Sequence, residues 1–165
     1  MSTNNIDETN NVEEVEYKGL GGWLILLGIG IVLNPLNSIL STYTIFKACF
    51  SEGKWSILTS PTSETYHILL KPTIIFEFAT NIIMVILSLT VLVLFFKKSK
   101  HFPKVWITNF LVLILFLAID IVLCNQIPSI PVDNLYTQLF KNIIPLAIWG
   151  TYLKKSKRVR NTFVK

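Results

Sequence analysis

The chain has 165 residues, of which 52% are hydrophobic and 15% are charged, and its mean hydropathy is +0.55. A composition this apolar excludes an ordinary soluble domain and indicates a protein whose solvent is lipid. The net charge of +5 does not call for a nucleic-acid partner, because most of the basic residues stand just outside predicted helix ends.

Residues 1–17 are predicted to form a disordered acidic tail. The chain begins MSTNNIDETNNVEEVE, with acids and no base, whereas a secretory signal begins with a positive region before a short apolar stretch. We therefore expect no cleaved signal peptide, and we interpret this polar, aromatic-poor segment as a solvated tether.

Four apolar runs follow, each close to the roughly 20 residues of helix that cross a bilayer core. Backbone groups in lipid find no water to bond, so runs of this length must be helical. The sequence predicts an all-α fold, an integral membrane bundle of four transmembrane helices in one domain, residues 18–153. The predicted spans are about 20–46, 72–96, 105–124 and 135–153, and the fourth is the weakest.

The basic residues of the loops predict the orientation of this bundle. Lys and Arg are retained on the cytoplasmic side of a membrane, so the side richer in bases is cytoplasmic. The poorer side would hold Lys47, Lys54 and Lys71. The richer side would hold both termini, including the basic tail 154–165, together with Lys18, Lys97, Lys98, Lys100 and Lys104. We therefore expect both termini in the cytoplasm.

Polar residues of the four spans are predicted to meet near the outer side. At about 1.5 Å per residue, Glu77 lies about 8 Å, Asp120 about 6 Å and Lys141 about 9 Å below the outer boundary. Asn81 follows Glu77 on the same helix face, and Asn34 falls in the outer third of its span. Because an ionised group facing lipid is costly, these side chains should face the bundle interior, with Lys141 as the partner of Glu77 or Asp120.

Two interpretations of this layer stay open. The carboxylates could pair or snorkel only to hold the helices in register. They could instead line an outward-facing pocket for a small polar or cationic solute. The candidate pocket residues are Asn34, Glu77, Asn81, Asp120 and Lys141.

Small and aromatic residues predict contacts at the helix surfaces. Gly21, Gly28 and Pro35 recur every seven residues and predict a smooth face that backs onto a neighbouring helix. Cys49 and Cys124 fall near the outer ends of two spans, where either a disulfide or two buried thiols would fit. The tryptophans near predicted boundaries are interpreted as interfacial anchors: Trp23, Trp55, Trp106 and Trp149.

The sequence offers little support for catalysis. His67 and His101 fall on opposite sides of the membrane and cannot share a metal. No H-E-x-x-H, C-x-x-C, G-x-S-x-G or phosphate-binding glycine loop is present. We expect no enzyme, no cofactor and no metal site.

Three stretches are similar to a known family: GGWLILLGIGIVLNPL at 21–36, IFEFATN at 75–81 with FFKKSKHFPKVWI at 95–107, and IWGTYLKKSKRVRNTFV at 148–164. The chain resembles the YdgK-like family of bacterial inner-membrane proteins, a domain of unknown function, and the ending SKRVRNTF is the most specific piece. That family usually has Trp-Ile-Pro-Tyr where this chain has Trp149-Gly150-Thr151-Tyr152. The resemblance implies a four-helix protein of the bacterial inner membrane and supplies no site residues.

Together these features predict a non-enzymatic accessory or interaction protein. Its expected partners are lipids, further copies of the chain or an envelope complex, and not nucleic acid. Basic residues near a membrane attract anionic head groups by about 1 kcal/mol each. The alternative is binding or transport of a small solute or ion through the outward-facing pocket. Four helices are few for alternating access, so transport by a lone monomer is disfavoured and a dimer is expected for it. The candidate docking residues are Lys154, Lys155, Lys157, Arg158 and Arg160.

Overall fold

A computed structural model describes residues 19–51, 54–63, 66–128 and 130–165. The predicted acidic tail, 1–17, lies outside these residues. Within them the secondary structure is helical, which confirms the all-α prediction. The helices are α1 (Trp23–Phe50), α2 (Lys54–Thr59), α3 (Leu70–Phe96), α4 (Phe102–Cys124), α5 (Asp133–Lys155) and α6 (Lys157–Thr162).

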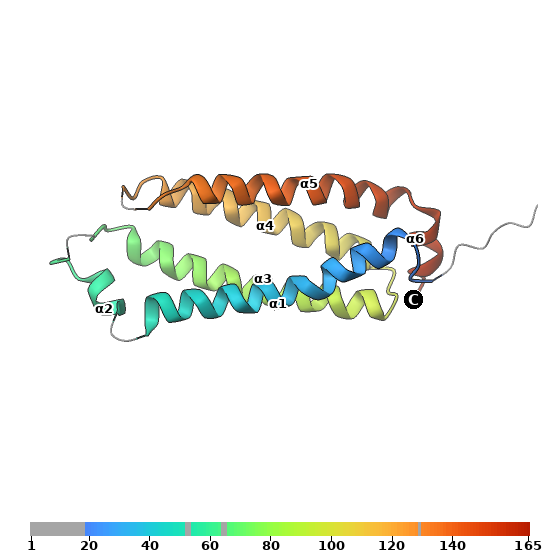
Figure 1. Ribbon diagram of the computed structural model, residues 1–165, viewed down its shortest axis with the longest axis horizontal. Coiled ribbons are helices and arrows are strands. Elements are labelled where there is room, and N and C mark those ends of the chain that lie inside the picture. The colour runs from blue at the N-terminus through green and yellow to red at the C-terminus, as the bar shows by residue number, and fades with distance from the viewer. Residues whose placement is uncertain (1–18, 52–53, 64–65, 129) are drawn as a thin grey trace, which may run out of the picture.

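The four long helices form an elongated bundle in which neighbours along the chain run antiparallel (Figure 1). α3 packs against both α1 and α4, and α4 packs against α5. Three of these helices, α1, α3 and α4, are long and apolar enough to cross a membrane. α5 is as long as α4, at 23 residues, but its polar residues make it less apolar than these three candidate membrane spans.

Local sequence explains where several helices begin and bend. α1 starts after Gly22, whose φ of 59° is in the left-handed region that favours glycine. Pro103 fits the first turn of α4, where a missing N–H is tolerated. Pro35 in α1 and Pro145 in α5 each remove one internal hydrogen bond. The visible change of direction along α1 in Figure 1 agrees with a proline bend.

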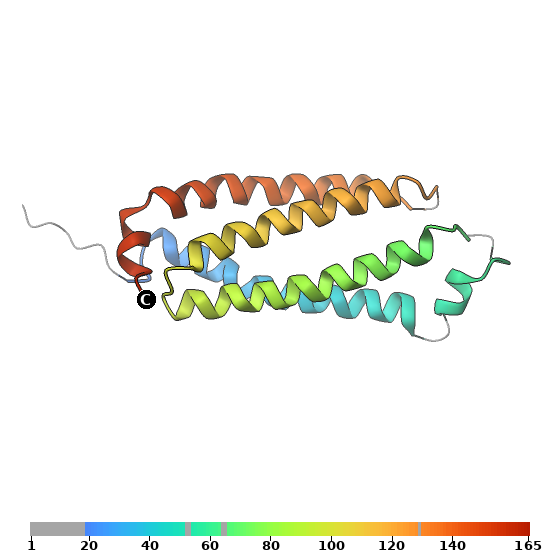
Figure 2. The same cartoon turned by 180° about the vertical axis from the view of Figure 1, so that it is seen from behind.

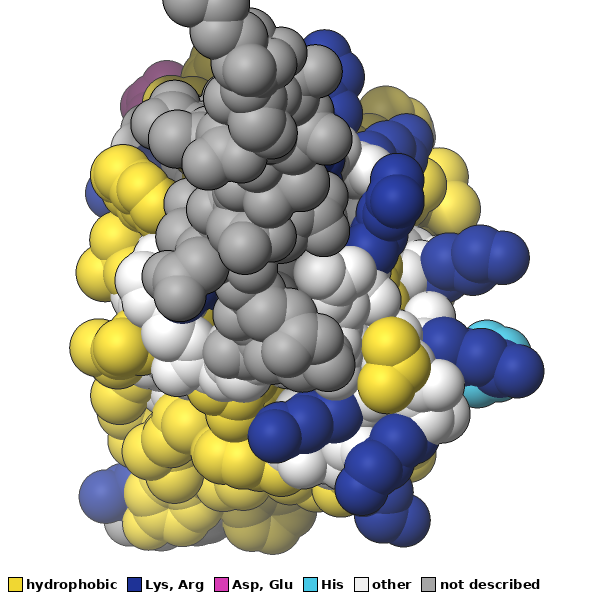
Figure 3. All heavy atoms as spheres, turned by 90° about the vertical axis from the view of Figure 1, so that its right-hand side faces the viewer, with side chains coloured by type: hydrophobic (Ala, Val, Ile, Leu, Met, Phe, Trp, Pro, Cys, Tyr) yellow, Lys and Arg dark blue, Asp and Glu magenta, His cyan; other side chains and the backbone are white. Residues whose placement is uncertain are grey.

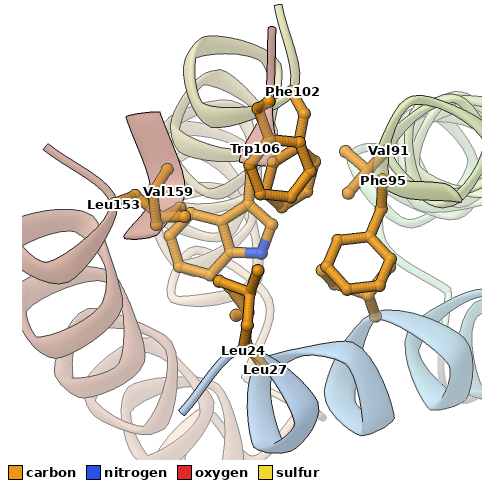
Figure 4. Packing of buried hydrophobic residues seen from close by; sticks show 10 residues of the cluster. Leu24, Leu27, Val91, Phe95, Phe102, Trp106, Leu153 and Val159 are labelled. Atoms are coloured by element: carbon orange, nitrogen blue, oxygen red, sulfur yellow. The ribbon is translucent and has the colours of Figure 1, made fainter. Parts of the chain in front are cut away.

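The main hydrophobic core lies at the end of the bundle where α6 closes it. The segment predicted as a basic tail is folded there, because Ser156 caps α6 by accepting a hydrogen bond from the Val159 amide and Val159 then packs inward. Figure 4 shows Trp106 of α4 pointing towards Leu24 and Leu27 of α1. The buried members are Leu24, Leu27, Ile31, Val91, Phe95, Phe102, Trp106, Leu153, Val159 and Phe163.

Hydrogen bonds fasten the C-terminal segment to both neighbouring loops. The Thr162 hydroxyl accepts from the Gly19 amide at 3.0 Å and lies 3.2 Å from the Gly19 carbonyl, to which it donates. The Lys100 amide donates to the Lys165 carbonyl at 2.7 Å, and the Lys165 amide donates to the Lys98 carbonyl at 3.3 Å. Residues 156–165 therefore form part of the folded domain.

A smaller core closes the opposite end. Leu70, Ile74 and Ile127 are buried there, and the neighbouring short helix α2 was not predicted from the sequence. Phe50 at the end of α1 stacks on Trp55 of α2, with ring centroids 4.8 Å apart. This packing holds α2 against the ends of α1 and α3.

The predicted smooth face of α1 packs against α3 at Gly28. A Cβ atom on Gly28 would lie 3.0 Å from the Phe95 ring, whereas one on Gly30 would meet nothing within 4 Å. We expect Gly28→Val to lower the free energy of unfolding by about 1–3 kcal/mol through overpacking. Gly30→Val is the matched control, and thermal unfolding in detergent measures both. Equal effects of the two substitutions would contradict close packing at Gly28.

Candidate functional site

The bundle is open along one side, between α1 and α5. The extensive helix contacts join α1 to α3, α3 to α4 and α4 to α5, but not α1 to α5. Trp23 and Trp149 bring the two helices together near α6, with ring centroids 6.2 Å apart. From there α1 and α5 diverge towards the α2 end, as the two opposite views show (Figures 1 and 2). We call this opening the α1–α5 seam.

The larger cavity of the seam, here called the acidic cavity, has a volume of about 450 Å³ and is lined by all four long helices. Glu77 of α3 and Asp120 of α4 are its charged residues. Asp120 is buried and Glu77 is half-buried. The remaining polar lining consists of Ser41, Thr44, Thr80, Asn81 and Gln138.

The two carboxylates have few partners in the part of the chain that is described. The Cys124 thiol, one turn along α4, lies 3.7 Å from Asp120 Oδ1 and donates to it. The Asn81 amide donates to the backbone carbonyl of Glu77 at 2.7 Å rather than to its carboxylate. No basic residue lines this cavity. The site therefore presents two acidic groups and several neutral donors to whatever occupies it.

A second cavity, here called the amide cavity, lies closer to the main core. It has a volume of about 410 Å³ and is also lined by all four long helices. Its polar lining carries no charge, and Trp106 and Trp149 supply aromatic surface. The polar residues are Asn34, Asn37, Ser88 and Asn142.

The structure brings together three of the five predicted pocket residues: Glu77, Asn81 and Asp120. Asn34 lines the amide cavity instead. Lys141 lines neither cavity; its side chain is exposed, and among the described residues it makes no ion pair with either carboxylate. The reason is the rotation of α5, which turns Gln138 and Asn142 towards the cavities and leaves Lys141 exposed.

The comparison with known proteins gives a family but no activity. A family model described as a protein of unknown function, DUF2569, matches residues 17–164, which include all six helices. The chain belongs to the DUF2569 family. The predicted resemblance to a domain of unknown function is confirmed to that extent. No curated protein and no solved structure matches the chain.

The basic end of this DUF2569 protein carries the predicted docking residues. Lys154, Lys155, Lys157 and Arg160 are exposed, and Figure 3 shows basic side chains gathered around this end. Arg158 differs, because its guanidinium lies where a Cβ on Gly21 would be only 2.6 Å away. Arg158 is thus packed against the start of α1, and the other four face outward.

Sequence reasoning missed part of the cavity lining and one aromatic position. Gln138 faces the acidic cavity, a role that the polar face of α5 could have indicated. Trp106 is only 3% exposed, so the prediction that it anchors the chain at the membrane interface is wrong. Cys49 and Cys124 are free thiols, but only Cys124 is buried, as the second interpretation expected of both; Cys49 is half-buried.

Proposed function

We propose that this DUF2569 protein is a non-enzymatic, four-pass membrane protein that works by association, and that the α1–α5 seam receives its partner. The observation that carries the proposal is that polar side chains on both edges of the seam bond within their own helix. Thr44 donates to the Leu40 carbonyl at 2.9 Å, and Asn142 donates to the Gln138 carbonyl at 2.8 Å. In the described chain, no side-chain hydrogen bond is found that crosses from α1 to α5.

Such a seam is costly in lipid and favourable against another helix. Lipid offers no hydrogen bonds, and polar side chains between membrane helices contribute about 0.6 kcal/mol each on average. Pro35 and Pro145 add further hydrogen-bond acceptors. Because proline has no backbone N–H, the carbonyls of Ile31 and Lys141 lack their usual helical donors. A partner in the seam would offer these groups further hydrogen bonds across the interface and remove them from lipid.

The same proposal accounts for the composition of α5. Its polar side chains at the cavities would be shielded from acyl chains by α1 and by the partner, while its apolar residues face lipid. Phe140, Ile144 and Ile148 are 64%, 59% and 60% exposed. α5 would then be the fourth span despite its lower apolarity.

The charge of the α6 end supports a cytoplasmic location for both termini, in a bacterial inner membrane. We expect a fluorescent protein fused after Lys165 to fluoresce in bacteria, and alkaline phosphatase at the same position to stay inactive. Alkaline phosphatase inserted in the 60–63 loop provides the control, since it should be active. The reverse pattern would contradict the orientation.

Site-specific photo-crosslinking in intact bacteria tests the association directly. A photoreactive residue in place of Asn37, which is exposed and lines the amide cavity, is expected to give adducts of protein mass. Ile86 on α3 is 60% exposed and provides the control position for lipid. If Asn37 and Ile86 both give only lipid adducts, the seam is not an association surface.

A second function is favoured by the acidic cavity itself. Two carboxylates in a cavity of about 450 Å³, without a lining base, fit a small cationic solute. A monomer that retains such a cation after gentle extraction would support solute binding over association.

A further inference from the structure

Lys141 is a cation about two turns into α5, far from the helix ends where membrane proteins usually carry their bases. The other described basic residues lie in loops, in α2 or α6, or in the first or last turn of a long helix. Its side chain is exposed, and it lies between Gln138 and Asn142, which line the two cavities. An ionised group at this depth is costly unless it is paired, and the described residues supply no ion pair for it.

The acidic cavity has two carboxylates and lacks a cation. Glu77 and Asp120 line it together, and no basic side chain of the described residues does. Gln138 of α5 also lines this cavity, and Lys141 follows three residues further along the same helix. Among the described residues, Lys141 is therefore a cation without an ion pair, and the acidic cavity has no lining base.

The heights of the two features match. Lys141 lies three residues from Gln138, which lines the acidic cavity, so the two differ by only about 4.5 Å along α5. Membrane insertion gives every copy of the chain the same orientation. A two-fold axis along the membrane normal then keeps each residue at its own depth and brings seam against seam.

We propose that the α1–α5 seam is the interface of a homodimer, in which Lys141 of each copy enters the acidic cavity of the other and pairs with Glu77 and Asp120. The interface is self-complementary, so each pairing occurs twice. The inference rests on the proposed association function and names its partner as a second copy of this chain.

Native mass spectrometry of the full chain, extracted in mild detergent with its lipids, tests the dimer. The wild-type protein is expected to be dimeric at micromolar concentration. Lys141→Met, and separately Glu77→Gln with Asp120→Asn, should each raise the dimer dissociation constant by at least about tenfold. The triple variant should raise the dissociation constant no further than the more strongly affected of these two variants does, because both remove the same pairing.

Lys71→Met is the matched control, since Lys71 is exposed in the first turn of α3, away from the seam. It should leave the dissociation constant unchanged. Thermal unfolding of every variant checks that a loss of the dimer does not come from a loss of the fold. If Lys141→Met is unstable, the variant Glu77→Gln with Asp120→Asn still tests the pairing.

Several results would overturn the dimer. These are a monomeric wild-type protein, a dimer that the substitutions leave intact, additive effects of the two sets, or a monomer that holds a small cation. If the protein is monomeric but a photoreactive residue at position 37 still crosslinks to another protein, the homodimer is contradicted and the association function is not. A monomer without such adducts would remove both.

Discussion

Phe163→Ala is expected to lower the free energy of unfolding by about 3–5 kcal/mol, the range for deleting a buried aromatic side chain. Phe163 is 5% exposed and stacks on Phe102 with ring centroids 4.4 Å apart. Its ring also lies 5.8 Å from that of Phe95. Because Phe163 follows α6, beyond the membrane-spanning helices, the hydrophobic effect acts on it in addition to packing.

Phe96→Ala is the matched control for this substitution. Phe96 lies beside Phe95 in α3, but it is 57% exposed, so its removal leaves no comparable cavity. Thermal or denaturant unfolding in detergent measures both variants. A loss at Phe163 no larger than that at Phe96 would mean that the C-terminal segment is a loose tail rather than part of the core.

The long helices were predictable because lipid permits only one local structure for a long apolar run. Predicted and observed boundaries differ by a few residues, as in 72–96 against Leu70–Phe96 for α3. α6 was missed because its bases hide its apolar residues. Val159 and Phe163 are four residues apart and are buried together in the main core, while Arg160 between them is exposed.

The acidic cavity was predictable only in part, because the sequence gives the depth of a residue but not the rotation of its helix. Glu77 and Asp120 line the same cavity. α1 also continues to Phe50 rather than ending near residue 46. Four further residues shift the level by about 6 Å. Ser41 and Thr44 therefore face the acidic cavity, and Asn34 lies in the next one.

For α5 the missing quantity was the rotation. Its contact with α4 decides which side of the helix faces the cavities, and that contact depends on side chains from both helices. Gln138 lines the acidic cavity, whereas Lys141, three residues further along, is exposed. Equal depth alone predicted that Lys141 pairs with Glu77 inside one chain. The rotation of α5 does not bring the two together, and we propose instead that Lys141 pairs with the carboxylates of a second copy.

Trp106→Ala is the second substitution with a large expected effect, again about 3–5 kcal/mol of unfolding free energy. The Trp106 ring belongs to the main core and also lines the amide cavity, so it separates that cavity from the aromatic residues at the α6 end. Its ring lies 4.4 Å from that of Phe110. Removing it joins a new void to an existing one, which limits how far the neighbours can collapse into the space.

Trp23→Ala provides the control, because Trp23 is 67% exposed although it also contacts an aromatic ring, that of Trp149. Trp106→Phe should recover part of the loss by refilling the core. Unfolding in detergent measures stability, and the reaction of Leu27→Cys with a water-soluble maleimide, in a background lacking Cys49 and Cys124, measures access through the amide cavity. Trp106→Ala should speed that reaction and Trp23→Ala should not. If both alanine variants behaved alike, Trp106 would not divide the polar seam from the closed end of the bundle.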